Sequence, residues 1–438
     1  IGEVYLWQLI FYLRCKKVDR FKSKYFKVLP KKSEILSQLS RLKIGKINNI
    51  YLFEYSSCSA VFCVEVKDKN NKQFKIVIRG EQQSGNVQRP ENSYSLEKEI
   101  VAYKLMHKLG LNVPNVLFNS KIFSVPGYDE EGMKIKDFNF FLMSYVEGIA
   151  VDKKIKTVDD YEKLILLNKV SSIMAKVHSV KGKEYGFIDQ YKNASFQTGT
   201  IDGFLNALHS ITIKLLKENI GDDFTREVNI FMKDKIFPLS YELKNSGYSP
   251  QISLVLFDGS AGNMLINDKN IQIIDLVNLG FFEPLTDFCA HFFCMKDILI
   301  SNYKGKSFWD HFVESYKAHG GILPSEPHLT QLFHIINVYF LCDAIIGYKT
   351  HSGSNKREKT NDLIEATRRV MSLVSPNISD IAKALYRSPA FIKAVIERLG
   401  IPQKLATTDY EGIRLAMLPE QCVAETFDEG ERVWSIKG

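Results

Sequence analysis

The sequence predicts an α+β protein of two lobes, in which a small antiparallel β-sheet lobe precedes a mainly helical lobe. Three observations support this expectation. Three β-rich runs separated by short turns fill residues 48–80, as in an antiparallel meander. From residue 157 onward, apolar side chains recur mostly at helical spacing. Within that helical part, the apolar segment 254–287 places oxygen-bearing side chains beside small-residue turns, where a site can form.

Composition limits the class of protein. The chain has 438 residues, 45% hydrophobic and 25% charged, which is ordinary for a globular protein of two or three domains. The formal net charge of +8 weakly favours anionic partners such as nucleotides. Seven cysteines without metal-type spacing indicate reduced thiols and a cytoplasmic protein. The apolar run 4–13 is too short to cross a bilayer and lacks signal-peptide features, so we expect no membrane partner.

We expect four regions along the chain. Residues 1–45 form a basic, helical extension, 46–146 the sheet lobe, 147–374 the helical lobe and 375–438 a small C-terminal helical region. The extension has two interpretations. It either packs on the first lobe with its basic face in water, or it contacts a nucleic acid or an anionic surface.

Three side chains in the 254–287 segment form the candidate catalytic set. An apolar strand leads to Asp258, a small-residue loop presents Asn263, and the chain turns back so that Asp275 returns to the same end. We therefore expect the three to converge at one edge of a β-hairpin. Phosphoryl transfer needs a carboxylate to orient and deprotonate a hydroxyl, and oxygen ligands to hold Mg²⁺. The alternative is an ordinary hairpin with a polar turn, since Asp, Asn and Gly are common turn residues.

This segment resembles the catalytic core of the aminoglycoside phosphotransferase and choline kinase-like family, a branch of the protein-kinase-like fold. The family carries a His-x-Asp-x-x-x-x-Asn loop followed by an Ile-Asp metal ligand. The resemblance implies that Asp258 is the catalytic base and that Asn263 and Asp275 bind Mg²⁺. Leu256 stands where the family has its histidine. That departure keeps open the alternative of a catalytically weak, kinase-like sensor.

The resemblance also implies a site for ATP or GTP in the sheet lobe. The Ser-rich turn containing Ser57 and Ser59 lies where the fold covers the phosphates. Arg79, at the end of Ile-Val-Ile-Arg, takes the place of the third-strand lysine and would neutralise the phosphates. Alternatively, Arg79 is an edge-strand residue that faces water. The following helix, expected from residue 96 to 109, should carry the acid that pairs with Arg79.

Two carboxylates compete for that pairing. Glu97 and Glu99 are two residues apart, so they cannot share a helix face, and we choose Glu99 from the family pattern. Farther along, the strand 138–145 resembles the hinge between the lobes. Its resemblance to the hinge implies that the backbone of Ser144 to Val146 pairs with adenine and that Met143 guards the pocket.

The helical lobe is expected to begin with a central helix over residues 161–178. That helix ends at His178, for which we expect a structural role. Residues 200–247 form two or three helices, which in the family build the pocket for the hydroxyl-bearing small molecule. Asp287 is expected to cap or brace the metal-bearing loop. The acceptor itself is left open, since choline-like, amino-alcohol, aminoglycoside and sugar acceptors all remain candidates.

The C-terminal region resembles a helix-turn-helix with a wing. A short helix over 378–385, a second over 389–399 and a hairpin over 425–434 carry the resemblance. The partner would be a nucleic acid, whose phosphates could meet Arg387, Lys393 and Arg398. The alternative is a helical hairpin that caps the helical lobe or mediates dimerisation, which the acidic turn of the hairpin favours.

Together these observations predict a phosphotransferase that moves the γ-phosphate of ATP or GTP to a hydroxyl of a small molecule with the help of Mg²⁺. The alternative function is a nucleotide or metabolite sensor with little catalytic activity, coupled to a DNA-binding C-terminal region.

Overall fold

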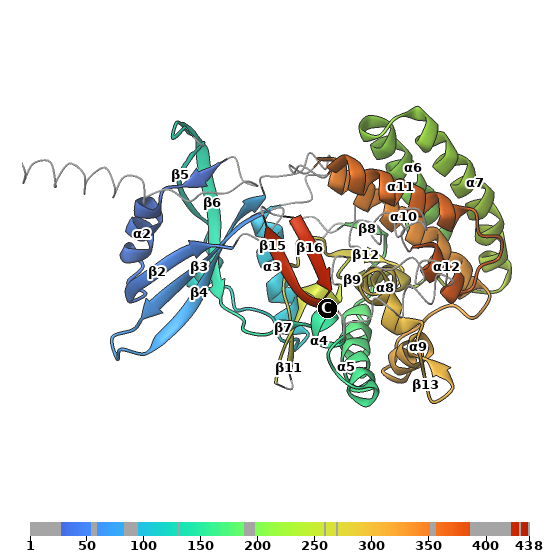
Figure 1. Cartoon of the computed structure of the whole chain (residues 1–438), viewed down its shortest axis with the longest axis horizontal. Helices are drawn as coiled ribbons and strands as arrows, with labels where there is room; N and C mark the ends of the chain where they lie inside the picture. The colour runs from blue at the N-terminus through green and yellow to red at the C-terminus, as the bar shows by residue number, and fades with distance from the viewer. Residues whose placement is uncertain are drawn as a thin grey trace, which may run out of the picture.

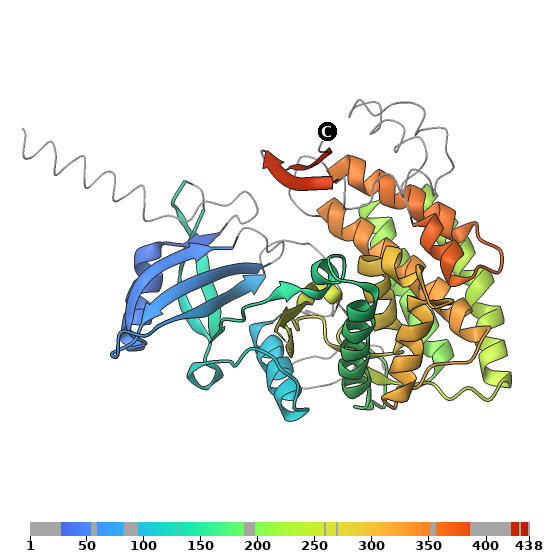
Figure 2. The same ribbon diagram turned by 60° about the horizontal axis from the view of Figure 1, so that its bottom comes forward.

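The computed structural model describes residues 28–53, 59–82, 95–129, 131–187, 198–257, 260–268, 270–350, 356–385, 422–428 and 431–436. The described chain forms two lobes, which occupy opposite ends of the molecule in both views (Figure 1, Figure 2). One end is an antiparallel sheet and the other is mainly helical, as the sequence predicted. The fold is therefore α+β and bilobal.

The first lobe is a six-stranded sheet in the order β1-β5-β6-β4-β3-β2, with all neighbouring strands antiparallel. Its strands are β1 (Leu29–Pro30), β2 (Lys46–Leu52), β3 (Ser59–Lys67), β4 (Gln73–Gln82), β5 (Phe123–Tyr128) and β6 (Lys134–Ser144). The turn between β3 and β4 is fixed by Asp68, whose carboxylate accepts hydrogen bonds from the N–H groups of Asn70 and Lys72. The predicted meander is present, with β5 and β6 added beyond it.

The position of β4 decides between the two interpretations of Arg79. In the register, Arg79 lies opposite Val61 of β3 and Phe141 of β6, so its strand has a neighbour on both sides. The alternative of an edge-strand arginine facing water is therefore wrong. The next residue, Gly80, has no room for a side chain, because an added Cβ would lie 2.3 Å from the ring of Phe138.

Helix α2 (Lys32–Arg41) covers part of the sheet lobe. Ile35 and Leu39 of α2 are buried in one cluster with the apolar side chains of β1 to β6. This part of the expected extension thus packs on the sheet. Residues 1–27 lie outside the described residues.

Helix α3 (Leu96–Lys108) follows the polar loop, and its N-cap Ser95 accepts a hydrogen bond from the Lys98 N–H. Its apolar side chains belong to the large core that also fills the helical lobe, so α3 joins the two lobes. Near it lie two small sheets, β7 (Ile149–Ala150) with β10 (Met264–Asn267) and β11 (Asn270–Ile273), and β8 (Gly186–Phe187) with β12 (Gly280–Phe282) and β9 (Ser253–Val255).

These small sheets correct one expectation. The strand that leads to Asp258 was expected to share the edge of a hairpin with the two strands that follow it. Instead, β9 pairs with β12, whereas the hairpin consists of β10 and β11 alone. The apolar run could not reveal this partner, because β12 lies farther along the chain and pairs through backbone atoms.

The helical lobe follows the predicted pattern. The central helix α5 is capped by Asp159 and ends at His178, and the 200–247 region forms two helices. Apart from η1 (Phe118–Ser120), which packs on the sheet lobe, the remaining elements are α4 (Val151–Lys154), α5 (Asp160–His178), α6 (Ile201–Asn219), α7 (Asp222–Asn245), η2 (Ala261–Asn263), α8 (Leu285–Leu299), β13 (Asn302–Tyr303), β14 (Lys306–Ser307), α9 (Phe308–Ala318), α10 (His328–Thr350), α11 (Lys356–Met371) and α12 (Ile378–Ala384).

Helix α10 is the core helix of this lobe and contacts α6, α7, α8 and α11. Among the described residues, its segment His328–Ile346 alone is long and apolar enough to cross a membrane, and 72% of it is buried inside the protein. A buried core helix passes the same test of length and hydropathy.

The C-terminal region is described in part. Helix α12 begins with a capping box between Asn377 and Asp380. Strands β15 (Cys422–Asp428) and β16 (Glu431–Ile436) pair as the hairpin predicted there. The second helix expected over 389–399, with Arg387, Lys393 and Arg398, lies outside the described residues. The helix-turn-helix thus stays a prediction.

Glu283, just after β12, is a buried carboxylate that links stability to pH. Its side chain accepts hydrogen bonds from the hydroxyls of Tyr185 and Tyr248 and from the Gln251 N–H. Burial nevertheless raises the pKa of Glu283 to about 7. Between the ordinary glutamate pKa and this value, the folded protein holds a proton that the unfolded chain releases, so stability falls as pH rises through that window.

We therefore expect Glu283→Gln, which cannot ionise, to lose this part of the pH dependence. Relative to the variant, the free energy of unfolding of the wild type should fall by roughly 3 kcal/mol between pH 4.5 and 7 and stay level above it. Urea unfolding at a series of pH values measures the difference. Parallel curves for the two proteins would show that Glu283 titrates normally.

Candidate active site

Arg79 is the centre of the candidate site. Its Nε lies 3.1 Å from Glu99 Oε2, and its Nη2 lies 2.6 Å from Asp275 Oδ1. The structure thus contains the pairing expected between Arg79 and Glu99, whereas the alternative acid, Glu97, is exposed on the other side of α3. The contact between Arg79 and Asp275 was not anticipated. It joins a sheet strand to the helical lobe across 196 positions of sequence.

Burial makes this cluster strongly electrostatic. Arg79 and Glu99 are 6% and 2% exposed, and the side chain of Asp275 is 34% exposed. Burial lowers the pKa of Arg79, but the carboxylates of Asp275 and Glu99 outweigh it and raise the pKa above the ordinary arginine value. The guanidinium is therefore always charged. Its planar group of donors can contact two carboxylates at once, which a lysine ammonium cannot do in the same geometry.

Tyr103 completes the cluster and was missed by sequence reasoning. Its hydroxyl oxygen accepts a hydrogen bond from the backbone N–H of Asp275 at 3.2 Å and lies 3.5 Å from Glu99 Oε1. Burial, followed by the Glu99 carboxylate, raises the pKa of Tyr103, which keeps its hydroxyl protonated. The signal was available, because Tyr103 follows Glu99 by one helical turn and shares its face.

The two proposed metal ligands lie together at one end of the β10–β11 hairpin. Met264 pairs with Ile273, and the Ile274 N–H donates to the Asn263 carbonyl at 2.9 Å. Asn263 and Asp275 thus flank this pairing, one on each side of the hairpin. Asp275 has a left-handed backbone with φ of 58°, which is uncommon for a residue with a side chain.

This pair of ligands fits a magnesium ion in its chemistry. Amide and carboxylate oxygens are the donors that Mg²⁺ takes in proteins, usually one or two of them beside water and phosphate oxygens. The carboxylate of Asp275 is partly exposed and already contacts one cation, Arg79. Among the described residues, no group of three His, Cys, Asp or Glu side chains is placed to hold a metal, so an all-protein metal site is not formed by them.

The loop that carries Asp258 is held by Asp287 at the start of α8. Asp287 Oδ2 accepts a hydrogen bond from the Leu256 N–H at 3.0 Å, and Oδ1 accepts one from the Phe257 N–H at 2.8 Å. Phe257 has φ of 61°, a conformation that the surrounding structure has to stabilise. The carboxylate therefore supports the strained turn just before Asp258. Asp287 was expected to cap or brace the metal-bearing loop. Its hydrogen bonds are to Leu256 and Phe257, which lie on the N-terminal side of that loop.

A buried chain of polar groups fixes Asp287 in turn. His178 Nε2 lies 3.1 Å from Asp287 Oδ2, and His178 Nδ1 lies 2.8 Å from the hydroxyl of Tyr316. Both ring nitrogens of His178 are therefore occupied, which agrees with the expectation of a structural histidine. All three residues are buried.

We expect Asp287→Asn to destabilise the protein by about 2 to 3 kcal/mol. An amide offers one acceptor oxygen where the carboxylate offers two, so a buried backbone N–H at Leu256 or Phe257 loses its partner. Chemical unfolding measures the loss. Asp297→Asn, at an exposed position of the same helix, is the control and should change stability by less than about 0.5 kcal/mol. Equal stability of the two variants would contradict the bracing role.

Leu256, which replaces the family histidine, is fully buried, and the aromatic ring next to it fills the core. Phe257 contacts the rings of Phe187, Phe282 and Phe340 at centroid distances of 4.8 to 5.3 Å. The loop is therefore held by an apolar cluster on its inner side and by Asp287 at its backbone. A histidine at position 256 is not needed to hold the loop.

Two predicted site residues lie outside the described residues, namely Asp258 and Ser57. Ser59 is described and lies at the start of β3, buried and opposite Gln82 of β4. It thus borders the end of the strand that carries Arg79.

The predicted hinge is the end of β6. Met143 is buried and lies opposite both Val77 of β4 and Val116. The Ser144 N–H, however, donates to the Asn115 carbonyl at 2.9 Å. This N–H is therefore occupied, so the expected pairing with adenine falls to the other backbone groups of the segment from Ser144 to Val146. The backbone groups of Tyr145 and Val146 remain candidates for that pairing.

Lys98 is a second cation that sequence reasoning missed. It is buried on α3, and its ammonium lies 5.7 Å from the centre of the Phe187 ring, which packs on Phe257. A positive charge is thus buried close to the loop that precedes Asp258. Nothing in the residue pattern indicated this, because a lysine on a helix is usually solvated.

No protein-family model matches the chain, and no curated protein matches it. Solved structures similar to it include aminoglycoside phosphotransferase APH(2'')-Ib in ADP-bound form, at 17% identity and a TM-score of 0.47, covering 81% of this chain and 99% of that one. A choline/ethanolamine kinase family protein from Mesorhizobium loti has 14% identity and a TM-score of 0.48, covering 80% and 99%.

A further similar structure is a microcompartment-associated aminopropanol kinase, at 16% identity and a TM-score of 0.48, covering 80% of this chain and 99% of that one. These similar structures are small-molecule kinases.

Proposed function

We propose that this protein is a phosphotransferase that moves the γ-phosphate of ATP or GTP to a hydroxyl group of a small molecule. One observation carries the proposal, namely the buried Arg79 that contacts both Glu99 and Asp275. A phosphate-binding cation, the acid that orients it and a metal-binding carboxylate come from three distant segments and meet at one point. An ion pair with only a structural role needs one cation and one carboxylate, without a second carboxylate from a distant segment.

In the proposed reaction, Asp258 orients the acceptor hydroxyl and takes its proton as the oxygen attacks the γ-phosphorus atom. Proton removal and positioning are the main contributions a protein makes to this reaction, beside charge stabilisation. The strained backbone at Phe257, held by Asp287, supports this role because it fixes the direction in which the chain enters position 258. Arg79 neutralises the non-transferred phosphates, and Glu99 with Tyr103 fixes its orientation.

Asn263 and Asp275 would hold Mg²⁺, which neutralises charge on the phosphate oxygens when bound. Arg79 contacts Asp275 directly, so the guanidinium and this metal-holding carboxylate would serve the same nucleotide. The backbone of Tyr145 and Val146 would bind the base, and α6 and α7 would border the acceptor.

The test is an acceptor screen with the full chain, ATP or GTP, and MgCl₂. Choline, aminopropanol, gentamicin and related amino alcohols are incubated singly, ADP or GDP is quantified, and the acceptor is examined for an added phosphate by mass spectrometry. The proposal expects nucleotide consumption that matches phosphorylated acceptor one to one. Nucleotide binding without transfer to any acceptor, together with DNA binding by the full chain, would instead favour the sensor.

A further inference from the structure

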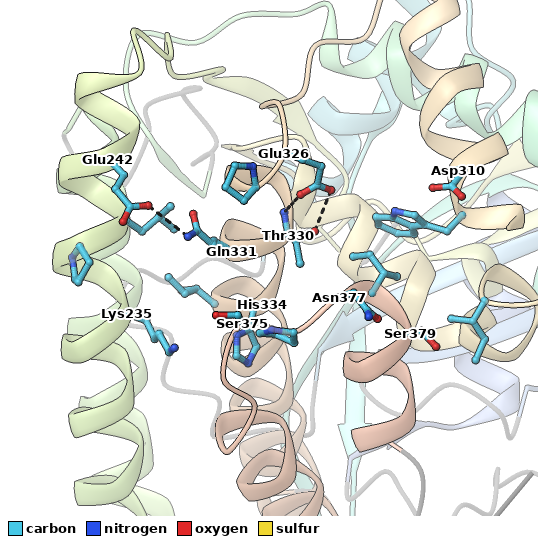
Figure 3. Close-up of a pocket in the computed structure, with 18 of the residues that line it drawn as sticks. Lys235, Glu242, Asp310, Glu326, Thr330, Gln331, His334, Ser375, Asn377 and Ser379 are labelled. Atoms are coloured by element: carbon cyan, nitrogen blue, oxygen red, sulfur yellow. Dashed lines mark hydrogen bonds between the residues drawn. The ribbon is translucent and has the colours of Figure 1, made fainter. Parts of the chain in front are cut away.

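A cavity of about 940 Å³ lies within the helical lobe (Figure 3). Its walls come from α7, from the first turns of α10, from the junction of α8 and α9, and from the segment 375–379. A volume of this size is at the upper end of the range for sites that bind small organic molecules. None of the residues of the candidate active site lines it.

The rim of the cavity is acidic on two sides. Asp234 and Glu242 belong to α7, whereas Asp310 belongs to α9 and Glu326 precedes α10. Figure 3 shows Glu242 and Asp310 on opposite sides, with Glu326 between them. Lys235 is the single lysine or arginine among the lining residues. Its one positive charge balances only part of the negative charge of the four carboxylates. Two negative ends favour a ligand with two separated positive charges.

Some of these carboxylates already have partners. Glu326 accepts from the N–H and the hydroxyl of Thr330 at the start of α10, and Glu242 accepts from the Gln331 amide at 3.3 Å. These bonds orient the carboxylates and use part of their acceptor capacity, since a carboxylate has about four acceptor positions. Each can therefore accept a further hydrogen bond from a bound ammonium group.

The inner wall contributes an aromatic donor. Trp309 is 5% exposed and packs against Phe288, Phe292 and Phe333. Among the described residues its indole N–H makes no hydrogen bond, and its nitrogen is not one of the fully buried polar atoms, so it can donate to a molecule in the cavity. An almost buried donor on the wall of a cavity points to a ligand that offers an oxygen acceptor.

His334 forms the wall beside Gln331 and does not add a charge. Its Nε2 lies 2.8 Å from the Val370 carbonyl. Burial lowers the pKa of His334, and Lys235 lowers it further, so the ring is neutral near pH 7. His334 therefore does not reduce the net negative charge of the rim.

We propose that this cavity is a binding site for a linear organic diamine that carries a hydroxyl or ether oxygen. Its two ammonium groups contact the α7 carboxylates, Asp234 and Glu242, at one end and Asp310 or Glu326 at the other, and its oxygen accepts from Trp309. The proposal does not depend on the proposed phosphotransferase activity, because it rests on residues that line a separate cavity.

The experiment uses the full chain and 2,2'-(ethylenedioxy)bis(ethylamine), a diamine with two ether oxygens, in isothermal titration calorimetry and thermal unfolding. We expect one molecule to bind per chain and to raise the melting temperature beyond the effect of MgCl₂ at equal ionic strength. The double variant Asp234→Asn/Glu242→Gln should bind about tenfold more weakly, because it loses both charges at one end. Both positions are exposed, so the variant should fold normally.

Glu218→Gln is the matched control, since Glu218 is exposed on α6 and does not line the cavity. It should bind the diamine as the wild type does. 1,8-Diaminooctane has the same length without oxygens and should bind more weakly. Absence of binding, or equal binding by the wild type and the double variant, would overturn the site. Equal affinity for the two diamines would overturn the role of Trp309.

Discussion

Asp258→Asn should reduce the rate of phosphoryl transfer by about a thousandfold or more while leaving nucleotide binding within about threefold of the wild type. Asparagine has nearly the same shape as aspartate but cannot accept the proton of the attacking hydroxyl. In the proposed site the nucleotide is held by other residues, namely Arg79 and the hinge backbone, so its affinity should hardly change. Single-turnover transfer to the acceptor identified in the screen, together with calorimetric binding of a non-hydrolysable nucleotide, measures both quantities.

The matched control is Asp268→Asn, in the exposed turn between β10 and β11 of the same segment. It should transfer phosphate at the wild-type rate. If Asp258→Asn kept full turnover, Asp258 would not be the base. If it lost nucleotide binding as well, its role would be structural.

Arg79→Met should lower the free energy of unfolding by about 3 to 5 kcal/mol, because Glu99 remains buried without its ion-pair partner. This is the largest effect on stability that we expect from a single replacement in the site. Chemical unfolding of the variant measures it. The double variant Arg79→Met/Glu99→Gln should recover a part of the loss, since it removes the unpaired charge as well.

The role in nucleotide binding is tested by a milder change. Arg79→Lys keeps the charge, but a lysine ammonium cannot contact Glu99 and Asp275 in the bidentate manner of a guanidinium. We expect the affinity for magnesium nucleotide to fall about tenfold, with a much smaller loss of stability than in Arg79→Met. Glu97→Gln, at an exposed position of α3, should bind nucleotide normally, whereas Glu99→Gln should not. Equal behaviour of the two glutamate variants would contradict the cluster.

The sequence predicted the elements of the fold better than their partners. The helix expected over 161–178 from its apolar spacing is present as α5, although its N-cap at Asp159 was not anticipated. The pairing of β9 with β12 did not follow, because a short apolar strand carries no information about which distant backbone it contacts. Pairing in these sheets is set by the packing of the whole lobe.

The same distinction applies to the candidate site. Arg79, Glu99 and Asp275 could be named because their order along the chain resembles a known pattern. The contact between Arg79 and Asp275, the position of Tyr103 and the occupied N–H of Ser144 could not be named, because each depends on how two distant segments approach one another. The cavity of the helical lobe is a stronger example, since its lining residues come from several distant elements and share no motif.

The double contact of Arg79 has a consequence for how the protein responds to a nucleotide. Glu99 and Asp275 would repel each other if they faced one another alone, and the guanidinium serves as their internal counter-ion. In the proposed site Asp275 would also hold a divalent ion, and Arg79 would face the phosphates of the nucleotide. The two carboxylates are therefore held together by a cation of the chain itself before any nucleotide binds.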